Sequence, residues 1–136
     1  MRCLIDTNIL INLVEHDFIS NDVRAILDDC ENQIYVSSES VKEYIQLIQT
    51  ERVVLEKNYR SRDVFDLIEN EFGLQVKYIT KKHLETLSKL KTVEGHNDPS
   101  DRLIISQAIT EKIPLISSDK KFPKYTKFGL DLIPNR

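Results

Sequence analysis

The sequence predicts one α/β domain spanning residues 1–136, with a central parallel sheet of about five strands flanked by helices. Short apolar runs alternate with segments of helical periodicity, which is the order of elements that gives a parallel sheet covered on both faces. The composition is that of an ordinary globular protein: 40% of the 136 residues are hydrophobic, 30% are charged, and only three glycines and four prolines occur. No linker, repeat or low-complexity tract divides the chain, which is long enough to bury one hydrophobic core.

The predicted elements alternate along the chain. Short runs with several branched side chains are predicted to be strands, at Arg2–Ile5, Ile34–Ser37, Gln75–Ile79, Pro114–Ser118 and Leu130–Ile133. Segments that repeat apolar residues at helical spacing are predicted to be helices, at Asp22–Cys30, over a long stretch from Glu39, and at Ser61–Phe72, Thr80–Lys91 and Pro99–Lys112. The two helices between Glu39 and Phe72 form an insertion between the second and third strands. Gly73 is suited to follow a helix end, and Asp98 with Pro99 is suited to begin one.

The charge balance and the cysteines exclude several classes of protein. The chain has 19 basic and 22 acidic residues, a net charge of −3, so no overall positive field indicates a nucleic-acid partner. The net charge does not exclude a local basic patch. Cys3 and Cys30 lack the number and spacing of a disulfide framework and are interpreted as small buried apolar residues. Polar residues interrupt the apolar N-terminal stretch and no long apolar run occurs, which predicts a cytoplasmic protein without a membrane segment.

Acidic residues recur at one edge of the predicted sheet, where the strands end. Asp6 follows the first strand, Glu43 lies in the helix after the second, and Asp119 follows the fourth. Asp98 and Asp101 lie in the first turn of the helix that leads into the fourth strand. Functional residues of open parallel sheets gather at the carboxyl ends of the strands, so we expect these carboxylates to lie close together.

A cluster of carboxylates without matching bases repels itself, and a divalent cation is its simplest stabilising partner. Hard oxygen ligands suit Mg²⁺ or Mn²⁺, which keep coordination positions open for water or phosphate oxygens. One or two such ions can activate water and neutralise charge on a phosphodiester during in-line attack. The residues alone therefore suggest metal-dependent phosphoryl chemistry.

Four segments together resemble the PIN-domain ribonucleases, and among them the VapC-type toxins of toxin–antitoxin pairs. They are the opening LIDTNIL, Glu43, the segment HNDPSDRLIISQA at His96–Ala108 and ISSD at Ile116–Asp119. Each motif alone is weak, but together they span nearly the whole chain in the order of that family. The resemblance implies an endoribonuclease that hydrolyses RNA phosphodiester bonds with Mg²⁺ or Mn²⁺. It also implies a cognate antitoxin that restrains the activity, and a homodimer.

The resemblance assigns roles to particular residues. The catalytic residues, also metal ligands, would be Asp6, Glu43, Asp101 and Asp119, with Asp98 as a further metal ligand. Polar groups supporting the site would be Thr7 or Asn8 beside the first aspartate, and Ser117 before the last. The sequence departs from the family's DP-aromatic-DR pattern at Ser100, which replaces the aromatic residue and changes the packing expected near the site.

Each acidic residue also has a structural explanation. Asp6 could form a turn or cap a helix, and Asp98 and Asp101 suit the first turn of a helix for dipole reasons alone. Glu43 could complete a capping box with Ser40 or simply face solvent. Arg102 is interpreted either as a surface cation or as a partner of one of the carboxylates.

The histidines and lysines complete the set of residues considered. His16, His83 and His96 have no partner at zinc-ligand spacing, so they are interpreted as surface or supporting residues rather than catalytic ones. Lys120, Lys121 and Lys124, with Lys127, follow Asp119 and are expected to guide an RNA backbone toward the carboxylates. Solvated lysines are the simpler explanation, and the lysines within residues 81–91 offer a second basic track.

Two other functions are compatible with a small parallel sheet that carries strand-end aspartates. The first is a catalytically inactive PIN-like module that binds RNA or protein. The second is a phosphoacceptor receiver domain. The receiver domain would need an acidic pair at the first strand, an aspartate on a central strand and a lysine at a strand end. Here Thr7 follows Asp6, and the third strand ends in Tyr78-Ile79-Thr80, which argues against it. A cleavage assay with metal separates the first alternative from a nuclease.

Overall fold

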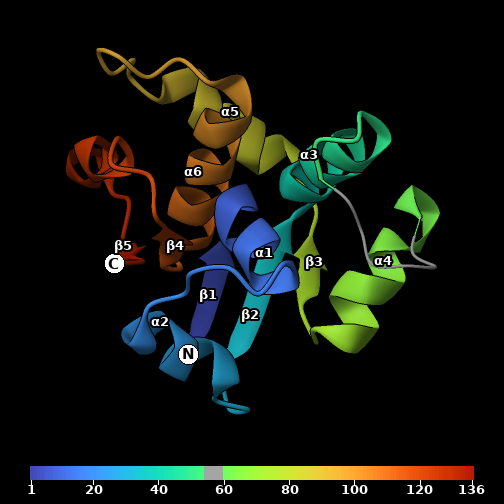
Figure 1. Cartoon of the computed structure of the whole chain (residues 1–136). Helices are drawn as coiled ribbons and strands as arrows, with labels where there is room; N and C mark the ends of the chain where they lie inside the picture. Colours follow the sequence, from blue (N-terminus) through green and yellow to red (C-terminus); the bar gives the residue numbers. More distant parts are fainter. Residues whose placement is uncertain (54–59) are drawn as a thin grey trace.

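The computed structural model, which describes residues 1–53 and 60–136, contains a five-stranded parallel sheet flanked by helices (Figure 1). The strands are β1 (Arg2–Ile5), β2 (Gln33–Ser37), β3 (Gln75–Lys77), β4 (Leu115–Ser117) and β5 (Leu132–Pro134). Their order across the sheet is β3-β2-β1-β4-β5, and every neighbouring pair is parallel. The predicted α/β fold and all five predicted strands are confirmed; the bounds of β1 are as predicted, and those of the other strands differ by at most two residues.

The predicted helices are also present. They are α2 (Asn21–Asp28), α3 (Ser38–Gln49), α5 (Lys81–Lys89) and α6 (Pro99–Glu111). The predicted Ser61–Phe72 helix is divided into a 3₁₀ turn η1 (Ser61–Asp63), a short α4 (Val64–Asp66) and a π-helical segment η2 (Leu67–Glu71). Gly73 follows with φ +66°, as expected for a residue after a helix end, while residues 54–59 of the predicted insertion lie outside the described chain.

Two elements escape the sequence analysis. Helix α1 (Thr7–Val14) begins directly after β1, and the 3₁₀ helix η3 (Phe122–Phe128) follows β4. Three polar residues, Asp6-Thr7-Asn8, separate the apolar residues of β1 from those of α1, and Asp6 suits a turn as well as a helix cap. In η3 a proline, lysines and aromatic residues alternate without the 3.6-residue spacing of an α-helix.

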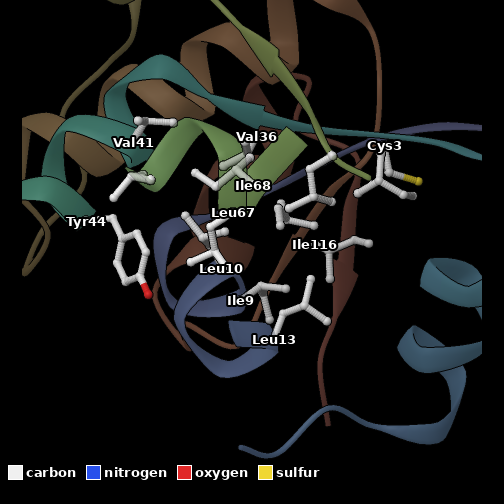
Figure 2. Packing of buried hydrophobic residues seen from close by; sticks show 14 of the residues in the cluster. Cys3, Ile9, Leu10, Leu13, Val36, Val41, Tyr44, Leu67, Ile68 and Ile116 are labelled. Atoms are coloured by element: carbon white, nitrogen blue, oxygen red, sulfur yellow. The ribbon is translucent and has the colours of Figure 1, made fainter. Parts of the chain in front are cut away.

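The core lies on both faces of the sheet because side chains alternate along each strand. In β1, Cys3 and Ile5 pack into one buried cluster with residues of α1, α3 and η2, which Figure 2 shows from close by. Leu4 points to the other face and packs with residues of α6 and η3, such as Ile105 and Tyr125. The prediction that both cysteines are buried is therefore right for Cys3 and wrong for Cys30, which is exposed at the end of α2.

The strand register aligns the carboxyl ends of three strands. Ile5 pairs with Val36 of β2 and with Ile116 of β4, so the residues that follow these positions lie level at one edge of the sheet. The end of β1 and the starts of α1, α3 and α6 lie at this edge. Within residues 1–53 and 60–136, no helix combines the length and the apolar character that crossing a membrane requires.

Candidate functional site

Asp6 is the most deeply buried acidic residue at this edge, with 3% of its surface exposed. It is the N-cap of α1, where its Oδ1 accepts a hydrogen bond from the backbone N–H of Ile9 at 2.9 Å. Its Oδ2 accepts one from the hydroxyl of Ser117 at 2.5 Å. Burial raises the pKa of Asp6 to about 6, although both hydrogen bonds favour the carboxylate. The capping explanation of Asp6 thus holds together with its place at the predicted site.

Ser117 connects two of the predicted site residues at the end of β4. Its hydroxyl donates to Asp6, and its Oγ accepts the backbone N–H of Asp119 at 3.0 Å. Asp119 is half-buried, and its Oδ1 accepts the backbone N–H of Lys121 at 2.8 Å. One serine side chain therefore fixes the carboxylate at the end of β1 relative to the turn that carries Asp119.

Glu43 reaches the same edge from α3 and is held by Thr7. The Thr7 hydroxyl donates to Glu43 Oε1 at 2.8 Å, and its Oγ1 lies 3.0 Å from the Oγ of Ser40. The predicted capping box between Ser40 and Glu43 is wrong, because α3 starts three residues earlier, with Ser37 as its N-cap. Partial burial raises the pKa of Glu43, and its acidic neighbours add to the effect, while the Thr7 hydrogen bond opposes it.

Asp98 and Asp101 occupy the start of α6 as predicted. Asp98 is the N-cap and accepts the backbone N–H of Asp101 at 3.0 Å, but its side chain is exposed. Asp101 is half-buried, and this burial raises its pKa; the nearby Asp98 and Asp119 raise it further, whereas a hydrogen bond from His96 lowers it. Asp98 therefore has a complete structural role, and Asp101 faces the other carboxylates.

These four carboxylates affect one another's charge in part, and Asp101 is the neighbour that Asp6 and Glu43 share. Asp101 and Asp119 both raise the pKa of Asp6, and Asp101 also raises that of Glu43. Among the described residues, no lysine or arginine forms an ion pair with any of the four. The negative charge at this edge is thus balanced by hydrogen-bond donors only, and the set of hard oxygen ligands suits a divalent cation.

Of the two interpretations of His96, a surface residue or a supporting one, the structure favours the second. Its ring is 3% exposed, so the surface interpretation is wrong for it, and it is equally wrong for His83 at 1%. One ligand atom each from His96, Asp101 and Asp119 lie within 4.8 Å of one another. The histidine precedes Asp98 by two residues inside the quoted motif, which is the signal that could have indicated it.

Three other residues near the edge differ from expectation. Asn8 is exposed, and its side chain makes no hydrogen bond with a described residue, so Thr7 alone supports the site beside Asp6. Arg102 pairs with no carboxylate of residues 1–53 and 60–136: it donates to the backbone oxygens of Leu90 and Lys91 and to the Tyr125 hydroxyl. Ser100, at the position of the expected aromatic residue, donates to Glu39 at 2.8 Å and so ties α6 to α3.

The predicted basic track lies beside the carboxylates but is only partly free. Lys120 and Lys121 are exposed and directly follow Asp119. The Nζ of Lys124 donates to the backbone oxygen of Glu94 at 3.2 Å, and Lys127 lies over the ring of Phe128. Of the four lysines, the first two are therefore the ones best placed to meet a ligand at this edge.

Comparison with known proteins agrees with this architecture. The model of the PIN domain family matches residues 3–127 of the chain. Similar solved structures include VapBC2 from Rickettsia felis bound to a promoter DNA fragment, with a TM-score of 0.72, 19% identity and 98% of each chain covered. They also include VapBC-1 from nontypeable Haemophilus influenzae (TM-score 0.69, 18% identity) and a toxin–antitoxin complex from Klebsiella pneumoniae (TM-score 0.68, 17% identity), each with 98% of both chains covered. No curated protein matches the sequence.

Proposed function

The chain belongs to the PIN domain family, and from this premise we propose that it is a metal-dependent endoribonuclease and the toxin of a toxin–antitoxin pair. The observation that carries the proposal is the group of Asp6, Glu43, Asp101 and Asp119, which four separate elements bring to the carboxyl edge of the sheet without a paired cation among the described residues. A carboxylate as buried as Asp6 costs folding free energy when ionised, and a binding site for a cation offsets that cost.

The donor set fits Mg²⁺ or Mn²⁺. We assign Asp6, Glu43, Asp101 and Asp119 as the ligands, with the exposed Asp98 as an outer one. When bound, such an ion activates water and neutralises charge on a phosphodiester during in-line displacement. Two other residues keep the ligands in place. The Thr7 hydroxyl donates a hydrogen bond to Glu43 and the Ser117 hydroxyl donates one to Asp6, so both carboxylates are oriented before a metal binds.

An RNA cleavage assay tests the proposal. An unstructured RNA incubated with the protein should be cut internally in Mn²⁺ or Mg²⁺ and remain intact in EDTA. Asp6→Asn should abolish cleavage, because the variant keeps the cap to Ile9 but loses the ligand charge. RNA binding without cleavage in either metal would replace the nuclease by an inactive binding module.

The toxin role adds two partners, an antitoxin and a second copy of the chain. Its support is the fold shared with chains of the VapBC complexes. Light scattering should give the mass of a dimer. The protein encoded by the adjacent reading frame, coexpressed with this chain, should bind it and suppress RNA cleavage.

A further inference from the structure

His96 lies in the turn before α6 and is clamped between two aromatic rings. Its backbone pairs with Val93 in an isolated bridge. The edges of Phe122 and Tyr125 meet its ring with centroids 5.8 Å and 5.4 Å away, at steep interplanar angles. Both aromatic residues belong to η3 and are fully buried. The imidazole is thus held in one place by residues that follow Asp119 in the chain.

The hydrogen bonds of the ring determine which nitrogen carries the proton. Nδ1 lies 2.7 Å from the Tyr125 hydroxyl, and Nε2 lies 3.1 Å from Oδ2 of Asp101. Arg102 donates to the same hydroxyl oxygen at 3.3 Å, and a guanidinium can only donate. The tyrosine oxygen accepts from Arg102 and keeps its own proton available for Nδ1, which accepts it when the neutral ring carries its proton on Nε2.

The carboxylate end gives the same assignment. An ionised Asp101 can only accept a hydrogen bond, so Nε2 must carry a proton. A ring protonated on both nitrogens would also donate from Nε2. With a neutral ring, every hydrogen bond of the series is donated in the same direction, from Arg102 to Tyr125, from Tyr125 to His96 and from His96 to Asp101.

We infer that His96 is a positioning residue for the metal centre: its Nε2–H, set by Tyr125, holds the Asp101 carboxylate within reach of Asp119. This inference rests on the proposed function, since it concerns one of the proposed ligands. The reason is electrostatic. Asp101 starts a helix beside Asp98 and near Asp119, and like charges would turn its half-buried side chain toward water without a donor on the opposite side.

The Mn²⁺ affinity of three variants, measured by calorimetry, tests this role. His96→Ala removes the donor and should weaken Mn²⁺ binding by about tenfold or more, the usual effect of losing a hydrogen bond to a ligand. His96→Gln places an amide N–H close to the position of Nε2 and should stay within about threefold of the native protein. His83→Ala is the matched control, because His83 is an equally buried histidine bonded to Glu111 at the other end of α6. It should lower thermal stability without changing Mn²⁺ affinity.

The two proposals fail in different ways. Native protein that binds no Mn²⁺ contradicts the metal-dependent function. If the native protein binds Mn²⁺ and His96→Ala binds it equally well, the positioning role is wrong. The role is also wrong if His96→Gln binds Mn²⁺ as weakly as His96→Ala, and this second result would make Nε2 itself a metal ligand.

A measurement without metal tests the inference independently. ¹⁵N NMR of the imidazole in the metal-free protein should show a proton on Nε2 of His96. A neutral ring protonated on Nδ1 instead would overturn the inference, whatever the metal does.

Discussion

Asp6 shows how one side chain can serve both the fold and the proposed chemistry. Its two oxygens are taken by Ile9 and Ser117, so it ends β1, begins α1 and fixes β4 with full hydrogen bonding. A neutral amide could keep the cap to Ile9 without the cost of burying a charge, although it could not also accept the Ser117 hydroxyl. The cost of burying a carboxylate at this position is therefore an argument for the proposed cation site rather than for the cap alone.

The first prediction at the residue scale is that Asp6→Asn stabilises the metal-free protein at neutral pH. The pKa of Asp6 is about 6 in the folded protein against 3.8 for the free side chain, so the folded state binds the proton more tightly. The native protein therefore loses stability as the pH rises from about 4 through 6, by about 3 kcal/mol at pH 7. Thermal melts in EDTA should show the advantage of Asp6→Asn at pH 7 and little of it at pH 4.

Saturating Mn²⁺ provides the control for this prediction. The metal should raise the melting temperature of the native protein, because it binds the folded state, and raise that of Asp6→Asn much less. Equal melting temperatures of the two proteins in EDTA at both pH values would show that Asp6 carries no charge penalty.

At this scale the sequence predicts correctly those roles that depend on neighbouring residues in the chain. Asp98 is the helix cap that its place before Pro99 indicates. The sequence cannot decide between the two interpretations of His96, and it wrongly predicts that Cys30 is buried, because both environments depend on the fold. The aromatic residues that bury His96 lie more than twenty positions away, and Cys30 is exposed because α2 has already ended at Asp28.

At the scale of elements, the site depends on where strands and helices end. Asp101 and Asp119 are carried by the start of α6 and the end of β4, and both face Asp6. Metal ligands act as a unit, so Asp101→Asn or Asp119→Asn alone should reduce RNA cleavage by a factor of a hundred or more, and the double variant should be little worse. Single-turnover rates at saturating Mn²⁺ measure this.

Asp98→Asn is the comparison within the same helix turn. Asparagine keeps the cap of α6, and the side chain at this position is exposed, so we expect a smaller loss of rate and a change in stability within about 0.5 kcal/mol. Small losses from every single variant that simply multiply in the double one would argue against a shared metal.

The elements that the sequence predicts well are those whose apolar pattern changes at their borders. The five strands are such cases, and so are α5 and α6. Helix α1 is indicated only by Asp6, which suits a turn as well as the helix cap that it forms. The start of α3 lies one residue from the predicted one, and only the capping box is wrong, because Ser37 rather than Ser40 is the N-cap.

At the scale of the whole molecule, charge is distributed unevenly. The net charge is −3, and the proposed metal ligands concentrate negative potential at the carboxyl edge. An RNA backbone would need cations beside that edge to approach it. The sequence places Lys120 and Lys121 next to Asp119, but only the fold shows that both are exposed there and that Lys124 is bound to Glu94.

The last prediction is that Lys120→Ala combined with Lys121→Ala weakens RNA binding. The loss should be largest at low salt, and the slope of log affinity against log salt should fall by about 0.7 to 1 for each phosphate contact removed. Mn²⁺ affinity should not change, because the contact of Lys121 with Asp119 uses the backbone N–H, which alanine keeps. RNA binding is measured with Asp6→Asn present in every protein, so that the RNA stays intact.

Removing two cations elsewhere separates a local track from the overall charge. Arg24 lines a cavity beside the starts of β2 and β3, and Lys112 ends α6 just before β4, so both lie at the opposite edge of the sheet. Arg24→Ala with Lys112→Asn makes the same change in net charge and should leave the salt slope as it is. If both pairs weaken binding equally, RNA responds to net charge alone; if neither does, it approaches by another face, and the lysines within residues 81–91 become the track to remove next.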